Sequence, residues 1–276
     1  MRQRSESVNL ANTAFVTLVT NDDYALGALA LVRSLKLSNP DRRIVVMATR
    51  SDLPLDRLER EGCDIRIVPR PEFSDDFVST HSRERQHSVA PFTKGTKPKF
   101  HDPLDNFCKL RVWEFEEYQR VVFLDADTIV VRNIDRLFGY PEFSAAPNLY
   151  ETLHDMHRLN SGVFVAEPSK ATFNHMLEKL VVPEIFWKRT DQTFLEAYFP
   201  DWHGLPYVYN VLQYVYFNLP QLWEWASIRV VHYQYEKPWE LDHERSEQLK
   251  PLIDLWYSVL EDRKIPEDVP RYTSPL

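Results

Sequence analysis

The chain has 276 residues, of which 43% are hydrophobic and 13% aromatic, enough for one large domain or two small ones. Its formal net charge of −8 argues against a dedicated nucleic-acid binder, because such proteins present a basic surface. No apolar run approaches the length of a membrane span and no signal peptide is evident, so we expect a cytoplasmic protein whose two cysteines are reduced core residues.

The first 70 residues alternate between strand and helix patterns. Asn21 offers an N-cap for a helix with one apolar face, and Gly62 fits the C-cap of a shorter helix. This order predicts an α/β fold, in which parallel strands are joined by right-handed crossovers. The strands are predicted at 15–19, 43–47 and 65–68, the first helix begins after Asn21, and the short helix covers 55–61.

Residues 70–104 interrupt this rhythm, because they are rich in Pro, His, Lys, Arg and Ser and show little periodicity. A long irregular segment of this kind is usually a functional lid or a disordered insert. Its basic side chains could close over phosphates or meet an anionic acceptor, and a solvated mobile loop is the equal alternative. These side chains are Arg83, Arg85, Lys94, Lys97 and Lys99.

Regular patterns return after residue 104. We find no internal repeat and no linker, so we expect one domain over residues 14–262, a flexible N-terminus of residues 1–13 and a C-terminal tail of residues 263–276. Helices are predicted at 105–116, 169–180, 191–199 and 249–260, strands at 143–146, 162–165 and 228–231, and a buried strand within the run 121–130 that ends in two carboxylates.

The most informative motif is VVFLDADTIV, residues 121–130, a buried strand that runs into two carboxylates. Asp125 and Asp127 are spaced i, i+2, and side chains at that spacing on a strand point to the same side. Hard oxygen ligands beyond the carboxyl end of a strand suit Mn²⁺ or Mg²⁺ holding a diphosphate. The alternative is a simple turn, because Asp is common after strands.

Four further features accompany the two aspartates. His232 follows an apolar strand, where it is a metal ligand or an ordinary core or surface histidine. Lys237, five residues later, could reach a phosphate on that metal or be a solvated surface lysine. Residues 160–162 (NSG) open a strand or form a turn, and Asp191 in 190–192 (TDQ) could be only a helix N-cap.

Together these motifs resemble family 8 of the glycosyltransferases, the retaining enzymes that include glycogenin and galactinol synthase. The resemblance runs from about residue 14 to 262 and is weakest at 70–104. FVTLVTNDDYALGALALVRSLK looks like glycogenin, while the tail that begins at KPWELDHERSEQ looks closer to galactinol synthase. NSGVFVAEPS, DQTFL, LPYVYN and KPW match the family's blocks in order.

The resemblance implies a GT-A fold, with a Rossmann-like, mostly parallel sheet flanked by helices, a UDP-hexose donor and a Mn²⁺ cofactor, with Mg²⁺ possible. It implies a metal site of Asp125, Asp127 and His232. It also implies a uridine pocket of Leu18, Thr20, Asn21 and Tyr24, donor contacts from Lys109, Lys237, Ala126 and Ser161, and a reacting centre held by Asn160, Asp191 and Gln192.

The acceptor is the point on which the resemblance leaves alternatives. The tail favours transfer to a small polyol or sugar, as in galactinol synthase. Glycogenin-like self-glucosylation would need a tyrosine of the protein itself, for which Tyr216 and Tyr214 are the candidates. A catalytically degenerate sugar-nucleotide binder is a third possibility, and a sugar-1-phosphate nucleotidyltransferase is disfavoured because the chain has no glycine-rich phosphate loop. A homodimer is expected by family analogy alone.

The chain departs from the family between His232 and Lys237. In the family this segment usually contains a glycine and is longer, whereas here Tyr235 stands in that region and the spacing is shorter. A glycine would let the backbone approach a phosphate closely, so we expect Tyr235 either to alter the phosphate contact or to stack on another group.

Overall fold

The computed structural model describes residues 9–82, 102–182 and 190–273. Within these ranges the strands form a seven-stranded sheet in the order β3-β2-β1-β4-β7-β6-β8. The first four run parallel, β7 is antiparallel to both β4 and β6, and β8 is parallel to β6. The strands are β1 (Thr13–Val19), β2 (Arg43–Ala48), β3 (Asp64–Ile67), β4 (Arg120–Leu124), β6 (Ser144–Pro147), β7 (Leu159–Ala166) and β8 (His203–Gly204).

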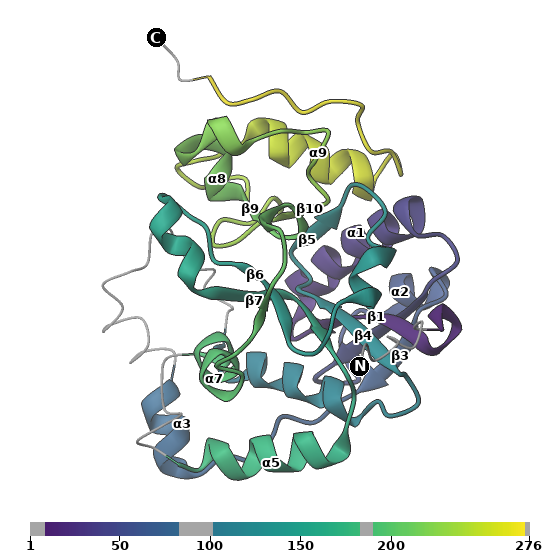
Figure 1. Ribbon diagram of the computed structural model, residues 1–276. Helices are drawn as coiled ribbons and strands as arrows, with labels where there is room; N and C mark the ends of the chain where they lie inside the picture. Colours follow the sequence, from purple (N-terminus) through teal and green to yellow (C-terminus); the bar gives the residue numbers. More distant parts are fainter. Residues whose placement is uncertain (1–8, 83–101, 183–189, 274–276) are drawn as a thin grey trace, which may run out of the picture.

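A second, three-stranded sheet lies beside the carboxyl end of β4 (Figure 1). It is built from β5 (Thr128–Val130), β10 (Val230–His232) and β9 (Val211–Leu212), and β10 pairs with both of the others. Helix α1 (Asp22–Ser38) holds β5 in this position, because the buried Ser34 hydroxyl accepts a hydrogen bond from Val130 N at 2.9 Å. The chain therefore leaves one sheet after β4 and enters the other at β5.

Two apolar cores cover the two faces of the large sheet, as the alternation along β1 requires. Phe15 and Val19 pack with the apolar residues of α1 and α9 (Lys250–Leu260), whereas Val16 and Leu18 face the opposite core. Figure 1 shows α1 and α9 on one side and α5 (Lys170–Leu180) on the other. The remaining helices are α2 (Asp56–Arg60), α3 (Asp75–His81), α7 (Asp191–Tyr198) and α8 (Gln213–Asn218), with 3₁₀ helices η1 (Leu10–Asn12), η2 (Asp105–Glu114), η3 (Asp135–Gly139), η4 (Leu153–His157), η5 (Tyr207–Tyr209) and η6 (Pro220–Leu222).

The predicted mixed α/β fold is confirmed, with a mostly parallel central sheet flanked by helices, but three predicted elements differ in detail. The strand expected to end in the two carboxylates stops at Leu124, a turn follows at residues 125–127, and β5 of the other sheet begins at Thr128. The helix expected from residue 105 is the 3₁₀ helix η2. The segment 70–104, expected to be irregular, contains α3, and its basic residues from 83 to 101 lie outside the described residues.

Residues 263–273, which we expected to form a tail, pack against the core. Val269 is buried and its carbonyl accepts a hydrogen bond from Trp223 Nε1 at 3.0 Å. The Glu267 carbonyl accepts another from Trp225 Nε1 at 2.9 Å. The domain boundaries at residues 13 and 262 stay predictions. Among the described residues, no helix combines the length and the apolar character needed to cross a membrane.

Candidate active site

A pocket opens beyond the carboxyl ends of β1 and β4, the place where α/β sheets bind ligands. Every candidate site residue named from the sequence lines it, except Asn21. Its lining consists of Leu18, Thr20, Tyr24, Asn106, Lys109, Asp125, Ala126, Asp127, Asn160, Ser161, Thr190, Asp191, Gln192, His232, Gln234, Tyr235 and Lys237.

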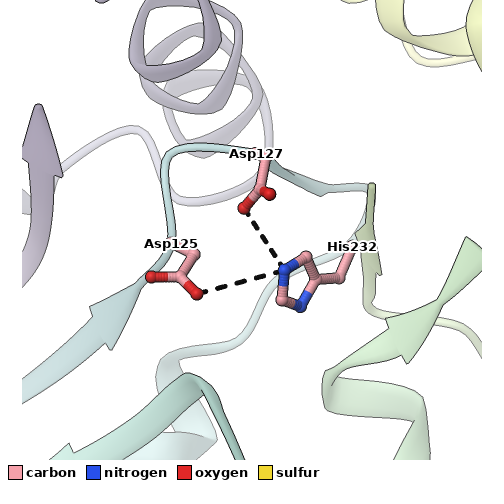
Figure 2. Close-up of side chains that lie close together, drawn as sticks. All are labelled: Asp125, Asp127 and His232. Atoms are coloured by element: carbon pink, nitrogen blue, oxygen red, sulfur yellow. Dashed lines mark ion pairs between the residues drawn. The ribbon is translucent and has the colours of Figure 1, made fainter. Parts of the chain in front are cut away.

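Asp125, Asp127 and His232 come together at the junction of the two sheets (Figure 2). The antiparallel pairing of β5 and β10 places His232 opposite Thr128, the residue that follows Asp127. The Tyr233 N–H also donates to the Asp127 carbonyl at 2.8 Å, which ties the turn to the end of β10. As a result, His232 Nε2 lies 3.2 Å from Asp127 Oδ1 and 4.0 Å from Asp125 Oδ2.

The carboxylates of Asp125 and Asp127 converge because of a turn, whereas the sequence predicted their convergence from i, i+2 spacing on a strand. Residues 125–127 form a turn rather than a strand end, and the Asp125 carbonyl accepts hydrogen bonds from the backbone N–H and the hydroxyl of Thr128. One ligand atom from each of Asp125, Asp127 and His232 lies within 4.8 Å of the others. Two carboxylates and an imidazole form a donor set that fits a divalent cation such as Mn²⁺.

Lys237 is buried beside this cluster, where it forms an ion pair with Asp127 and donates to the Tyr233 carbonyl at 2.8 Å. Burial alone would raise the pKa of Asp127, but the charges of Lys237 and His232 hold that pKa well below its ordinary value. Asp127 is therefore an anion in the described structure, as a cation ligand must be.

Lys109 is buried on the other side of the pocket. Its Nζ lies 2.8 Å from Asp125 Oδ1 and 3.1 Å from Asp191 Oδ2. Burial would lower the pKa of Lys109, but the two carboxylates more than reverse this and raise it above its ordinary value. The pKa of Asp125 is raised by burial, against the lowering effect of the Lys109 charge. The pocket thus places three carboxylates beside two lysines and the His232 imidazole.

Asp191 occupies the first position of α7, and Thr190 is the N-cap, which corrects the alternative that Asp191 itself is the cap. The Thr190 N–H donates to Thr193 Oγ1 at 3.0 Å. The Ser161 hydroxyl donates to Asp191 Oδ2 at 2.9 Å, and the Ser161 N–H donates to Gln192 Oε1 at 3.3 Å. Ser161 therefore orients the Asp191 carboxylate and the Gln192 amide at the start of α7.

Four lining residues were not among the candidate site residues. Asn106 lies three residues before Lys109 in η2, and residues at that spacing stand above one another in a 3₁₀ helix. Assigning Asp105–Glu114 as a 3₁₀ helix would have placed Asn106 on the same side as Lys109 and so in the pocket. Gln234 and Tyr235 lie between the cluster and Lys237, and Thr190 precedes Asp191.

Asn21 is the N-cap of α1, as its place before the helix predicts, and its assignment to the uridine pocket stays a prediction. Its Oδ1 accepts a hydrogen bond from Tyr24 N at 3.0 Å, so it positions the start of the helix that carries Tyr24. The two acceptor candidates also lie outside the pocket lining. Tyr214 donates its hydroxyl to Glu236, and Tyr216 packs on Trp223, with both tyrosine side chains buried.

Comparison with known sequences gives a consistent result. Residues 15–242 match the family model described as glycosyl transferase family 8. Human glycogenin-1 is 33% identical over 280 aligned residues, which cover 93% of this chain and 74% of that protein. Galactinol synthase 2 of Arabidopsis thaliana is 28% identical, with 91% and 82% covered. A putative UDP-glucuronate:xylan alpha-glucuronosyltransferase 5 of the same plant is 32% identical, with 84% and 37% covered.

Solved structures show the same fold. The galactosyltransferase LgtC, in complex with donor and acceptor sugar analogs, has a TM-score of 0.55 at 15% identity, with 92% of this chain and 98% of that chain covered. The apo form of the glycosyltransferase GlyE from Streptococcus pneumoniae TIGR4 has a TM-score of 0.59 at 17% identity, with 91% and 62% covered. These likenesses confirm the expected GT-A fold.

Proposed function

Because this chain belongs to glycosyl transferase family 8, we propose that it is a retaining hexosyltransferase that moves a hexose from a UDP-sugar to a small polyol or sugar. The observation that carries the proposal is one pocket that holds both a carboxylate-imidazole cluster and two buried lysines. A diphosphate leaving group needs positive charge on both sides, and this pocket can supply it.

The bond from the sugar carbon to the diphosphate breaks with its electron pair on UDP. In this proposal Asp125, Asp127 and His232 hold a divalent cation, Mn²⁺ or Mg²⁺, which supplies electrostatic stabilisation of that charge. Lys237 donates to the same phosphates, and its burial strengthens each such contact. Removal of one group of this kind typically costs about 10²–10³-fold in rate.

The sugar carbon becomes positive in the same step, and oxygen atoms must face it. Asp191 and Gln192 are the nearest candidates, with Lys109 and Ser161 holding the Asp191 carboxylate in place. We assign Asn160 to the sugar hydroxyls, and Leu18, Thr20 and Tyr24 to the uridine. Retention then follows from attack by the acceptor on the face that the leaving group vacates.

The substrates are proposed from the relatives and from the pocket. One relative is named for the nucleotide sugar UDP-glucuronate and an alpha linkage, which supports a UDP-linked donor, and a structural neighbour is a galactosyltransferase. We propose UDP-glucose and UDP-galactose as the donors to test first. A small acceptor is supported by Tyr214 and Tyr216, which are buried and do not line the pocket.

Self-glucosylation remains the second candidate because of the 33% identity to glycogenin-1. Intact mass after incubation with UDP-glucose would then rise in steps of one hexose. An unchanged mass would reject it. A degenerate sugar-nucleotide binder would instead bind UDP and release none from any donor and acceptor pair.

The decisive experiment measures UDP release from UDP-glucose and UDP-galactose, with Mn²⁺ or EDTA, and with or without myo-inositol. Release that inositol stimulates and EDTA abolishes would support a small-acceptor transferase and identify its sugar. Slow release that ignores inositol would support the donor site and move the search to other acceptors. Equal release in Mn²⁺ and in EDTA would contradict the cation site.

A further inference from the structure

A chain of buried amides connects His232 to the backbone of β7. His232 Nδ1 lies 2.9 Å from Asn210 Oδ1, and Asn210 Nδ2 donates to Asn160 Oδ1 at 2.8 Å. The same Asn160 oxygen accepts the Gly162 N–H at 2.9 Å, and Asn160 Nδ2 donates to Asn148 Oδ1 at 2.9 Å. Asn210, Asn160 and His232 are each at most 2% exposed, so water does not compete for these groups.

The donor and acceptor of each hydrogen bond in this series of amides can be assigned without ambiguity, starting from the backbone. The Gly162 N–H can only donate, so the Asn160 atom that meets it must be the oxygen. The Asn210 atom that meets this oxygen must then be the NH₂ group, which leaves the Asn210 oxygen facing His232. A carbonyl oxygen only accepts, so His232 Nδ1 carries its proton toward Asn210.

With Nδ1 committed as a donor, Nε2 is the only ring nitrogen of His232 that can offer a lone pair. Nε2 is also the atom that faces the carboxylates of Asp127 and Asp125. We propose that Asn210 is a positioning residue, which fixes the His232 ring so that Nε2 points to the divalent cation. This inference rests on the proposed function, because it assumes that the cluster binds a cation.

The packing around the ring points the same way. A Cβ atom at Gly162 would come within 2.3 Å of His232 Cε1 and 2.6 Å of Nδ1, so the ring lies directly against the β7 backbone. Such close packing restrains the plane of the ring, and the amide chain selects which nitrogen carries the proton. Partners of this kind behind a metal-binding histidine typically change metal affinity by about 10–100-fold.

The test compares Mn²⁺ binding, measured by electron paramagnetic resonance titration, in the wild type and three variants. Asn210→Leu removes the acceptor at similar volume, and we expect Mn²⁺ to bind about 10–100-fold more weakly. Asn210→Asp keeps an acceptor oxygen for Nδ1–H but loses the donor to Asn160 Oδ1, so its Mn²⁺ affinity should lie between those of the wild type and Asn210→Leu. Asn148→Ala removes the oxygen that accepts from Asn160 Nδ2, a bond that lies off the path from Gly162 to His232. Water can replace this oxygen because Asn148 is only half-buried, so Mn²⁺ affinity should match the wild type.

A second readout separates positioning from general damage. In the Mg²⁺-bound protein, ¹⁵N spectra of the histidine side chains should show His232 protonated at Nδ1, with His232→Gln identifying the signal. Protonation at Nε2, or equal Mn²⁺ binding by the wild type and Asn210→Leu, would overturn the inference and leave the proposed function standing. No Mn²⁺ binding by the wild type would overturn both. If Asn210→Leu does not fold, Asn210→Ala takes its place with the same expectation.

Discussion

Asp127 and Lys237 form an ion pair inside the protein, with 6% and 2% of their surfaces exposed. A buried charge whose partner is removed costs about 3–5 kcal/mol, whereas removing both charges costs much less. We therefore expect Asp127→Asn to lower the free energy of unfolding by about 3 kcal/mol and to reduce UDP release at least about 100-fold. The double variant Asp127→Asn/Lys237→Met should regain stability but not activity.

Urea unfolding of the two single variants and the double variant completes this cycle. Additive losses of stability would contradict the coupling, and the double variant would then be the least stable of the three. A recovery of activity in the double variant would contradict the role proposed for both side chains.

Tyr235 has a φ of +69°, in the left-handed region that favours glycine. A non-glycine residue pays about 1–2 kcal/mol for this conformation, and Tyr235 offsets part of that cost through ring contacts with Tyr150 at 6.0 Å and Tyr214 at 5.6 Å between centroids. Both Tyr235→Gly and Tyr235→Ala lose these contacts, but only glycine relieves the backbone. We expect the glycine variant to be more stable than the alanine variant by about 1 kcal/mol.

The matched control is Tyr257, which lies within the helix α9. There the order should reverse, with alanine more stable than glycine by about 1 kcal/mol, because helix interiors favour alanine. Unfolding free energies of the four variants test the pair, and alanine above glycine at position 235 would contradict a strained backbone.

At the scale of elements, α1 lies directly against the turn that carries the cluster. A Cβ atom at Gly27 would meet the Ala126 carbonyl at 2.7 Å and Trp239 Cη2 at 2.8 Å. Alanine gains about 1 kcal/mol of helix propensity, but overpacking against a backbone atom costs about 1–3 kcal/mol. We expect Gly27→Ala to displace the turn and to lower UDP release about tenfold or more, because misplacing catalytic groups by 1 Å can cost about 100-fold.

Gly139 supplies the control for this prediction, because a Cβ atom there would meet nothing within 4 Å. Gly139→Ala should keep the wild-type rate within about twofold. The measurement is the rate of UDP release by the two variants. An unchanged rate in Gly27→Ala would show that the turn does not depend on the close approach of Gly27 to the Ala126 carbonyl.

The elements explain what could be predicted from the sequence. The strands β1, β2 and β4 are mainly apolar, Asp125 follows β4 and His232 ends β10, so pattern located most of the parallel sheet and the candidate metal ligands. The family resemblance, and not pattern, supplied most of the other pocket residues. Periodicity does not show that a run changes sheets, which is why the break between β4 and β5 was missed. Strands β8 and β9 have two residues each, too few for any period.

The interactions that a side chain makes were harder to predict than its location in or near the pocket. The N-cap role of Asn21 was predicted from its place before a helix and is confirmed, whereas its assignment to the uridine came from the family resemblance alone and stays a prediction. Asn210 lies in LPYVYN, which carried the resemblance, yet nothing in the sequence shows that its amide faces His232. Contacts between residues more than 20 positions apart require the fold.

At the scale of the whole molecule, Glu61 joins segments from both ends of the chain. It forms ion pairs with Arg33 of α1 at 3.0 Å and with Arg263, which follows α9. Burial would raise the pKa of Glu61, but hydrogen bonds from Arg263 and Arg33 lower it to about 2. A carboxylate with a lowered pKa adds stability above the unfolded pKa of about 4.5, and that stability is lost as the pH falls toward 2.

We expect Glu61→Gln to lower the free energy of unfolding by about 2–3 kcal/mol at pH 7, and the difference from the wild type to shrink below pH 4.5. The control is Glu224→Gln, which breaks an exposed pair with Arg271 and should change stability by less than about 1 kcal/mol. Urea unfolding at pH 7 and at pH 4 tests both variants. A difference for Glu61→Gln that stays constant with pH would contradict the assignment.

The junction between the two sheets also sets when the cluster can exist during protein synthesis. The ribosome delivers Asp125 and Asp127 about 100 residues before His232. At roughly 5–20 residues per second, the nascent chain carries both carboxylates for about 5–20 s without the imidazole. During that interval β5 also has no β10 to pair with, so a growing chain can complete β1 to β4 while its donor site stays unassembled. If the proposed cation site is needed for sugar transfer, transfer can begin only after residue 232 has been translated and β10 has paired with β5.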